Sequence, residues 1–529
     1  MRRPPPVDWS PVTPTDAGLP RLPGHRPLLL ADLRDLLGDA LGGPADGVPV
    51  HGVTLASAEV VPGDLYAALP GARTHGVQYV PDAVARGAVA VLTDPTGRDA
   101  ALATGLPVCV VQDPRAVLGA VADRVYGEPS SRLTVIGITG TNGKTTTAYL
   151  VEAGLAAAGL GTGLIGTVQT RTRGRDDAGQ PTVTEIPSVR TTPEAPAVHA
   201  LLATMASAGV SAVVMEVSSH ALVMGRVGGV RFAVAGFTNL GRDHLDFHAD
   251  LEDYFQAKAR LFDGRAAREV VTVDDDAGRR LAALRPEART VSITGPGDWT
   301  ATGVAAAPGG GSTFTLSGPD GGRWPARVRL PGKFNVANAV LAVALLDAVG
   351  VPVEAALAGI ADTVVPGRME PVDAGQPFVA VVDYAHTPDA VSTALTALRG
   401  ATAGRLITVL GCGGDRDPGK RAAMGASAAL LSDVLVVTDD NPRSEDPAVI
   451  RAAMLAGARE VPEGDRAEVH EIGDRRGAIA AAVGLAGPGD TLLIAGKGHE
   501  TGQEVAGTVH PFDDRAVLRE ALAGTGTRA

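Results

Sequence analysis

Short apolar runs alternate along this 529-residue chain with longer stretches rich in alanine and leucine. An apolar run of about four to eight residues bounded by turn residues is typical of a buried strand, and a longer periodic stretch is typical of a helix. Strand runs of this kind, each followed by a polar loop, begin near Leu133, Ser211, Phe232, Phe378, Leu406, Val434 and Thr491. The alternation predicts an α/β fold built on parallel sheets.

The length predicts about three domains, each large enough to bury a core. The proline-rich start, residues 1–25, lacks the apolar segment of a signal peptide, and we expect it to be a flexible tail. Turn residues at Gly127–Ser131 and Pro366–Glu370 indicate two junctions. We therefore expect a small N-terminal α/β domain over 26–132, a central P-loop ATPase-like parallel sheet over 133–366, and a Rossmann-like α/β domain over 367–529.

The stretch LTVIGITGTNGKTTTAYL has the layout of a phosphate-binding loop, a strand followed by a glycine-rich turn and a helix. Its backbone amides can close around phosphate oxygens because glycine tolerates the angles of a tight turn. Lys144 would reach the β- and γ-phosphates and Thr145 would offer its hydroxyl to Mg²⁺. The strict motif has glycine where this chain has Ile138, and a plain turn between strand and helix is the alternative. The Lys-Thr-Thr run favours an ATP site formed by Gly140, Thr141, Asn142, Gly143, Lys144, Thr145 and Thr146.

Two further loops that follow apolar strands carry residues suited to metal and phosphate chemistry. Glu216 ends the apolar run in SAVVMEVSSH, and a carboxylate on the strand beside a P-loop commonly serves Mg²⁺ in ATPases. The alternative is a solvated glutamate at a strand end. The loop TNLGRDHLDFH contains His244, and imidazole and carboxylate groups are metal ligands. This second signal is weaker because loops are polar in general.

Lys258 is an unusual residue for its place in the pattern. In LEDYFQAKARLF it falls with Tyr254 and Leu261 on the apolar face of an expected helix. A lysine there is costly to bury unless it is paired or altered. The side chain could extend to water or lie buried close to a metal site, and the pattern alone does not choose between the two.

The last third of the chain has loops rich in Arg, Asp and Lys after its strands. Glycines in GCGGDRDPGKR suggest a dinucleotide site, but Arg416 breaks the G-x-G-x-x-G spacing. The charged loops instead suit a zwitterionic amino acid whose carboxylate takes a bidentate arginine. Upstream, Asn335 and Asn338 lie at the start of an apolar helix, where they could contact a nucleobase or cap the helix.

Composition narrows the classes of partner. The net charge of -12, with both signs spread along the chain, argues against nucleic-acid binding. Cys109 and Cys412 are the only cysteines, which fits a reducing cytoplasm and excludes a disulfide framework; we expect both to be buried or incidental. The sequence has no apolar run of about eighteen residues or more, so we expect no membrane span.

With these residues and motifs, the chain resembles the Mur ligases, which are ATP-dependent enzymes that form amide bonds in peptidoglycan synthesis. The resemblance covers nearly everything after the tail and is closest to members that add 2,6-diaminopimelate. It is carried, in the family's order, by TGTNGKTTT, MEVSSH, TNLGRDHLDFH, YFQAKARLF, LPGKFNVANA, VPGRME, DYAHTPDA, GCGGDRDPGKR, DDNPR and GKGHE. It implies a cytoplasmic, monomeric enzyme acting on ATP, UDP-N-acetylmuramoyl-L-alanyl-D-glutamate and meso-diaminopimelate.

The resemblance also implies a catalytic and metal-binding set. Lys258 matches the lysine that such enzymes carbamylate with CO₂. An ammonium with a pKa near ~10.4 cannot bind a cation at neutral pH, whereas a carbamate offers two anionic oxygens. Thr145, Glu216 and His244 match the other magnesium positions, and the expected catalytic residues are Lys144, Lys258, His244 and Glu216.

Substrate contacts follow from the same resemblance. Near the adenine, ribose and phosphates of ATP it places Asn335, Arg368 and Asp383. For the uridine of the UDP substrate it implies contacts from Leu55 and Ser57, and for a neighbouring part of that substrate it implies the loop Ala72, Arg73 and Thr74. For the muramoyl dipeptide it implies contacts from Thr191, Thr192, Ser218 and Arg226. The expected contacts to diaminopimelate are Arg416, Asp440, Asn441, Pro442, Arg443, Gly496 and Glu500.

Arg443 is the residue that favours diaminopimelate. Lysine-adding relatives generally lack this arginine, which can bind the extra carboxylate of meso-diaminopimelate as a charge-assisted pair, while Glu500 would take the ammonium of the same centre. The alternatives are a lysine-adding ligase of the same family and a folylpolyglutamate-type synthetase, which should lack the uridine domain. A non-catalytic nucleotide-binding homologue would be expected to lose Lys258 or His244, and both are present.

Overall fold

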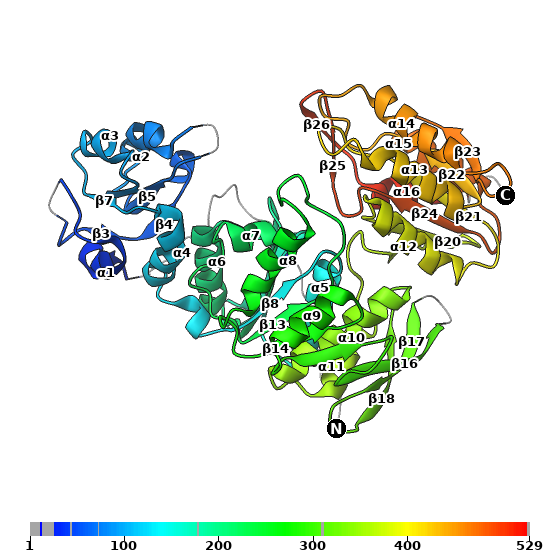
Figure 1. The fold of residues 1–529 in the computed structure, drawn as a ribbon, viewed down its shortest axis with the longest axis horizontal. Coiled ribbons are helices and arrows are strands. Elements are labelled where there is room, and N and C mark those ends of the chain that lie inside the picture. Colours follow the sequence, from blue (N-terminus) through cyan, green and yellow to red (C-terminus); the bar gives the residue numbers. More distant parts are fainter. Residues whose placement is uncertain are drawn as a thin grey trace. The chain divides into compact units, whose positions relative to one another are not determined.

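The computed structural model describes residues 11–12, 26–42, 45–71, 74–176, 179–307 and 311–525. These residues fall into two compact units. Figure 1 shows the helices and strands, with the chain coloured along its length. The first unit comprises the chain up to 240, 252–291 and 341–359, and the second comprises 241–251, 292–340 and 360 onward. The expected tail lies outside the described residues except for Pro11–Val12, which form β1 beside β11.

The N-terminal part of the first unit is a four-stranded parallel sheet in the order β4-β5-β6-β7, with a small β2–β3 ladder beside it. Apolar clusters lie on both faces of the sheet, because its strands are buried and nearly continuous in apolar residues. The strands are β2 (Leu28–Leu29), β3 (Pro49–Val50), β4 (Gly52–Thr54), β5 (Asp64–Ala68), β6 (Ala90–Thr93) and β7 (Val108–Val110). The helices are η1 (Leu30–Leu33), α1 (Arg34–Leu37), η2 (Ser57–Glu59), η3 (Gly76–Tyr79), α2 (Val80–Ala85), α3 (Arg98–Leu102), α4 (Pro114–Val125) and η4 (Pro129–Ser131).

The central sheet carries the P-loop strand in its middle, with β12 on one side of β8 and β13 on the other. Strands β9, β12, β8, β13, β14 and β15 run parallel in that order, and the β10–β11 hairpin extends the β9 edge. The strands are β8 (Thr134–Thr139), β9 (Thr162–Ile165), β10 (Gln169–Arg175), β11 (Pro181–Pro187), β12 (Ala212–Glu216), β13 (Val234–Phe237), β14 (Glu269–Thr272) and β15 (Arg289–Ser292). The helices are α5 (Lys144–Ala157), α6 (Ala195–Ser207), α7 (Ser219–Val223), α8 (Leu251–Ala259), η5 (Arg260–Phe262), α9 (Asp276–Leu284), α10 (Lys333–Ala348) and α11 (Val353–Ile360).

Helices α4 and α6 join the two sheets of the first unit and lie side by side in Figure 1. Gly119 of α4 packs against the turn at Gly228, where a Cβ would come within 2.4 Å of the Gly228 carbonyl oxygen. Beside it, Asp123 and His199 form a buried pair with 3.3 Å between carboxylate and imidazole. The junction is therefore packed tightly around small residues and one polar pair.

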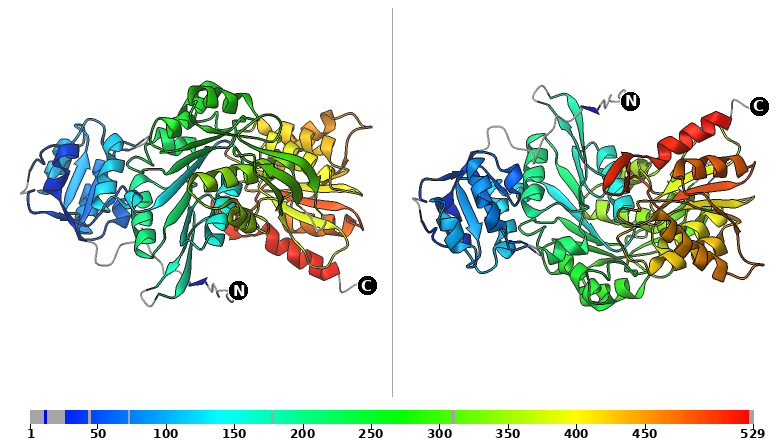
Figure 2. Two further views of the ribbon diagram at one scale, coloured as in Figure 1. Left: turned by 90° about the horizontal axis from the view of Figure 1, so that it is seen from below. Right: turned by 90° about the horizontal axis from the view of Figure 1, so that it is seen from above.

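The second unit contains an antiparallel β16–β17–β18 ladder and a six-stranded sheet in the order β19-β20-β24-β21-β22-β23. This larger sheet is parallel apart from β19 and is covered on both faces, with α12, α13 and α14 on one apolar cluster and α15 and α16 on the other. In Figure 2, α16 is the red helix that packs beside α15. The α/β fold with a parallel sheet that the sequence predicts for this part of the chain is thus confirmed.

The strands of the second unit are β16 (Trp299–Ala306), β17 (Ser312–Ser317), β18 (Arg323–Val328), β19 (Glu370–Pro371), β20 (Val379–Asp383), β21 (Leu406–Leu410), β22 (Val434–Val437), β23 (Glu468–Glu471), β24 (Thr491–Ala495), β25 (Gly502–Val505) and β26 (Thr508–Pro511). Its other helices are α12 (Pro388–Arg399), α13 (Lys420–Leu431), α14 (Pro447–Glu460), α15 (Arg475–Leu485) and α16 (Asp514–Thr525). Both cysteines are buried and free, as expected, and burial raises the pKa of Cys109 to about 11. Among the helices of the described ranges, none has the length and apolar character needed to cross a bilayer.

Candidate active site

The P-loop links β8 to α5 through two glycines with positive φ. Gly140 has φ +145° and Gly143, the N-cap of α5, has φ +85°. A Cβ on Gly140 would lie 1.8 Å from Thr238 Oγ1, so the loop can approach the end of β13 only because it has no side chain there. Lys144 curls back over the loop, and its Nζ donates to the carbonyl oxygens of Gly140 and Thr141 at 2.9 Å each. The loop is thus shaped for an anion at a helix N-terminus, with its lysine in reach.

Glu216 ends β12 next to the P-loop, as the sequence predicts, and pairs in register with Ile138. It is buried, and its Oε2 accepts from Thr145 Oγ1 at 2.9 Å. Its other contacts come from Thr167, whose amide donates to Oε1 at 2.7 Å and whose hydroxyl donates to Oε2 at 3.0 Å. A Cβ on Gly166 would meet Oε1 at 2.4 Å, so the turn after β9 fits closely around the carboxylate. Sequence reasoning missed Thr167.

Lys258 is buried, which answers the question that the helical pattern left open. Its side chain has an exposed fraction of 0%, and Nζ donates to the Gly140 carbonyl oxygen at 2.7 Å. Nζ also lies 4.3 Å from the ring centroid of Tyr254, a cation–π distance, and the Tyr254 hydroxyl accepts from Thr141 Oγ1 at 3.3 Å. The apolar stripe of α8 therefore delivers this lysine directly to the P-loop.

Four residues expected to contact the muramoyl dipeptide cluster at the end of β12. Thr192 Oγ1 donates to the Glu216 carbonyl oxygen at 2.8 Å and accepts from the Ser218 amide at 3.0 Å. Thr191 Oγ1 accepts from the Thr167 hydroxyl at 3.1 Å, and Arg226 Nη1 donates to the Thr192 carbonyl oxygen at 3.4 Å. Burial lowers the pKa of Arg226. The carboxylate of Glu194 opposes this shift, with its Oε1 2.9 Å from Arg226 Nε.

The expected uridine-contacting residues lie in the N-terminal sheet region. Leu55 is half-buried against its core, and Ser57 begins η2 with a hydrogen bond to Asp82. Thr74 accepts from the Gly71 amide through its carbonyl oxygen at 3.1 Å. Ala72 and Arg73 lie outside the described residues.

The second unit holds the other expected ATP residues and His244. His244 has φ +53° and lies on an exposed loop, where its amide donates to Asp243 Oδ1 at 2.8 Å. Asn335, near the start of α10, donates from Nδ2 to the Pro331 carbonyl oxygen at 2.8 Å. In the VPGRME segment, the guanidinium of Arg368 lies 4.4 Å from the ring centroid of Tyr384.

Asp383 lies half-buried at the end of β20, beside the same segment. Its two carboxylate oxygens accept from the amides of Met369 at 2.7 Å and Ala385 at 2.8 Å. Burial raises the pKa of this carboxyl, outweighing the opposing effects of Arg368 and the amides.

The expected diaminopimelate residues come together from the loops after β21, β22 and β24. Asn441 Nδ2 donates to Glu500 Oε2 at 2.8 Å, and Arg443, with φ +53°, donates from Nη1 to the Gly414 carbonyl oxygen at 2.5 Å. Arg416 lies apart from these contacts as an exposed residue on the first of the loops. Sequence reasoning missed Lys497, which is fully buried within this group; its place between two glycines after a strand was the available signal.

The residues expected to bind Mg²⁺ offer few of the side chains that usually bind metals. No group of three or more His, Cys, Asp or Glu suited to a metal occurs within the described ranges, and the expected set supplies only Glu216 and His244 of those types. The hydroxyl of Thr145 beside the Glu216 carboxylate offers the oxygen ligands that Mg²⁺ prefers. Lys258 as an ammonium is a donor and cannot be a ligand, so the set fits Mg²⁺ only if that lysine carries a carbamate.

Comparison with known proteins gives concordant matches along the chain. Three family profiles match: "Mur ligase family, catalytic domain" over 49–126, "Mur ligase middle domain" over 138–346, and "Mur ligase, glutamate ligase domain" over 367–498. The UDP-N-acetylmuramoyl-L-alanyl-D-glutamate–2,6-diaminopimelate ligase of Streptomyces avermitilis is 54% identical over 502 residues, covering 94% of this chain and 96% of the relative. The ligase of the same name from Corynebacterium glutamicum is 49% identical over 511 residues, covering 93% and 97%. A solved structure of a ligase with that name is 30% identical, with a TM-score of 0.66 and coverage of 94% and 99%.

Proposed function

The chain belongs to the Mur ligase family, and from this premise we propose that it joins meso-2,6-diaminopimelate to UDP-N-acetylmuramoyl-L-alanyl-D-glutamate at the expense of ATP. The observation that carries the proposal is the 54% identity to the Streptomyces avermitilis ligase of that activity over 94% of this chain. The enzyme is an amide-forming ligase of peptidoglycan precursor synthesis. ATP and a UDP-linked substrate are cytoplasmic metabolites, so we place its activity in the cytoplasm, and we expect it to act as a monomer.

The reaction proceeds in two steps. The γ-carboxylate of the D-glutamate attacks the γ-phosphorus of ATP, which releases ADP and leaves an acyl phosphate. The amine of diaminopimelate then attacks the acyl carbon, and the tetrahedral intermediate collapses with loss of inorganic phosphate. Positioning and charge stabilisation supply most of the catalysis in such a phosphoryl transfer.

The P-loop supplies the charge stabilisation for the first step. Its amides and the N-terminus of α5 face the phosphates, and Lys144 would exchange the loop carbonyl oxygens of Gly140 and Thr141 for the β- and γ-phosphate oxygens. Asn335, Arg368 and Asp383 are proposed to hold the rest of the nucleotide.

Thr145, Glu216, His244 and Lys258, the last as a carbamate, are proposed to hold Mg²⁺. When bound, the ion would neutralise negative charge on the phosphoryl oxygens. Burial of Lys258 against the Gly140 carbonyl oxygen supports this assignment because it places the end of the side chain at the phosphate-binding loop, away from water. Lys258→Ala should remove most activity, and a small carboxylate added to the assay should restore part of it. Full activity without additive would contradict the assignment, and intact-protein mass spectrometry would reveal the carbamate independently of activity.

The amino acid is the part of the proposal that a direct assay decides. ATP-dependent phosphate release should occur with UDP-N-acetylmuramoyl-L-alanyl-D-glutamate and meso-diaminopimelate, and far less with L-lysine, because Arg443 pairs with the extra carboxylate. Turnover with lysine alone would retain the ligase and overturn the amino-acid assignment. An absence of turnover with either would overturn the proposed function.

A further inference from the structure

Lys497 is a fully buried lysine within the group of residues assigned above to diaminopimelate. It follows β24 and lies between Gly496 and Gly498, which have φ +115° and +54°. Its side chain has an exposed fraction of 0%. A buried ammonium is costly unless it is paired, so the contacts that surround it are the reason it can be held there.

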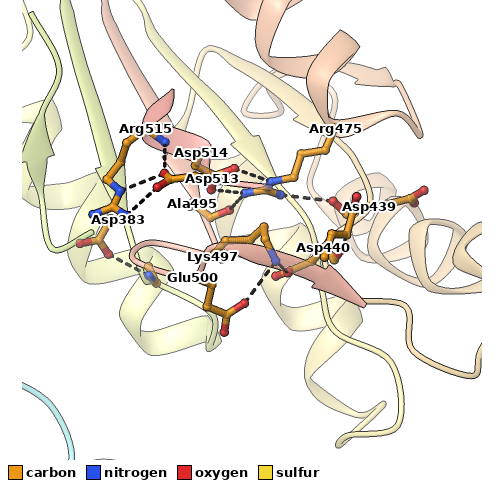
Figure 3. Close-up of polar contacts among 12 residues, drawn as sticks. Asp383, Asp439, Asp440, Arg475, Ala495, Lys497, Glu500, Asp513, Asp514 and Arg515 are labelled. Carbon is orange, nitrogen blue, oxygen red and sulfur yellow. Dashed lines mark hydrogen bonds and ion pairs between the residues drawn. The ribbon is translucent and has the colours of Figure 1, made fainter. Parts of the chain in front are cut away.

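The ammonium of Lys497 contacts three side chains, all from the proposed amino-acid site. Nζ donates to Asn441 Oδ1 at 2.9 Å. It also donates to Glu500 Oε2 at 3.2 Å and to Asp440 Oδ1 at 3.5 Å (Figure 3). Asn441 closes the triangle by donating from Nδ2 to the same Glu500 oxygen at 2.8 Å. Lys497 and Asn441 therefore both hold the same carboxylate oxygen of Glu500.

The backbone around Lys497 allows the loops after β22 and β24 to approach each other closely. A Cβ on Gly496 would lie 2.9 Å from Asp440 Oδ2, so the loops after β22 and β24 can touch only with glycine at that position. Arg475 holds the ends of the two strands together, donating to the carbonyl oxygens of Asp439 at 3.3 Å and Ala495 at 3.0 Å. These two residues directly precede Asp440 and Gly496, so the placement of Lys497 is fixed by the fold.

The charges of the group are suited to a substrate ammonium. Asp440 and Glu500 contribute two negative charges and Lys497 one positive charge, which leaves one negative charge in excess. Among the described residues, the side-chain contacts of Glu500 all fall on Oε2. Its second oxygen is thereby left to face a ligand.

We propose that Lys497 is a positioning residue that orients Glu500 and Asn441 to receive the ammonium of the second amino-acid centre of the substrate. This inference deepens the proposed function and rests on it. Lys497 acts through Glu500 and does not itself contact the reacting atoms.

Steady-state kinetics of Lys497→Met test the proposal. The KM for meso-diaminopimelate should rise about tenfold or more, as expected for the loss of about one charge-assisted contact, while the KM values for ATP and the UDP substrate stay within about twofold. Formation of a hydroxamate from the acyl phosphate, with hydroxylamine in place of diaminopimelate, should persist, because that step does not use the amino-acid site. Arg476→Met removes one positive charge from an exposed pair with Glu520 on the same unit and should leave all these values unchanged.

A double-mutant cycle separates positioning from a purely structural role. If Lys497 acts through Glu500, Lys497→Met combined with Glu500→Gln should raise the KM for diaminopimelate no further than Glu500→Gln alone. Additive effects, or an unchanged KM in Lys497→Met, would overturn the proposal while the proposed function stands. If Lys497→Met loses hydroxamate formation, the variant has misfolded, and Lys497→Arg then tests the proposal. Lys497→Arg should keep the hydroxamate reaction and raise the KM for diaminopimelate alone. An unchanged KM in Lys497→Arg would overturn the proposal. A wild-type enzyme that turns over no diamino acid would overturn the proposed function, and this inference with it.

Discussion

The ion pair of Arg475 and Asp514 gives the sharpest stability prediction for this protein. Both side chains have an exposed fraction of 0%. Arg475 donates to the Asp514 carboxylate from Nε at 2.8 Å and from Nη2 at 2.7 Å, and to two carbonyl oxygens at the ends of β22 and β24 (Figure 3). Arg475→Met would leave a buried carboxylate without its cation and two carbonyl oxygens without their donor.

The magnitude follows from that geometry. Removing one partner of a buried ion pair costs about 3–5 kcal/mol, because the other charge stays buried and uncompensated. The exposed pair of Arg476 and Glu520 lies on the same two helices, with side chains 55% and 63% exposed, and Arg476→Met should cost less than about 1 kcal/mol. Replacing both buried partners, as in Arg475→Met with Asp514→Leu, should recover much of the loss, since no unpaired charge then remains.

Hydrogen exchange of the β24 peptide is the assay of choice, because it reports the stability of the C-terminal sheet apart from the other unit. The protection of this peptide should fall steeply in Arg475→Met, remain near wild type in Arg476→Met, and return in part in the double variant. A loss of less than about 1 kcal/mol in Arg475→Met would refute the reasoning, since it is well below the cost of an unpaired buried charge. A double variant no more stable than the single one would refute it as well.

Two further predictions concern pH and the P-loop. Burial, reinforced by Arg368, lowers the pKa of His499 to about 3, whereas an unfolded histidine has a pKa near ~6.5. Between these two values the unfolded chain binds more protons than the folded chain. The free energy of unfolding should therefore fall as the pH drops from about 6.5 towards about 3. The urea midpoint should therefore depend less on pH over that range in His499→Gln than in the wild type, and equal slopes would contradict the assignment. Gly140 has a φ of +145°, and Gly140→Ala would place a Cβ 1.8 Å from Thr238 Oγ1, so this variant should lose detectable ATP binding by calorimetry. Gly159 is the control, because its φ is also positive, at +81°, but a Cβ there would meet no atom within 4 Å. Gly159→Ala should therefore bind ATP normally. Normal binding by Gly140→Ala would show that the loop can relax.

The sequence determined the features that depend on short windows of the chain. The apolar run and glycine turn predicted β8, the P-loop and the helix that follows it, and the same kind of pattern placed Glu216 at the end of the neighbouring strand. Carboxyl ends of parallel strands meet at one edge of a sheet, so the proximity of Glu216 to the P-loop followed from order and periodicity alone.

Tertiary structure decided which polar groups are buried and what they contact. Periodicity placed Lys258 on an apolar stripe, yet only packing against the P-loop showed that its ammonium meets the Gly140 carbonyl oxygen. The burial of Lys497 among Asp440, Asn441 and Glu500 left no periodic signal, since its partners lie on loops brought together by β22 and β24. A residue's helix or strand preference is set by neighbours a few positions away, whereas its desolvation and its hydrogen-bond partners are set by segments distant in sequence, and those are fixed only when the sheet has formed.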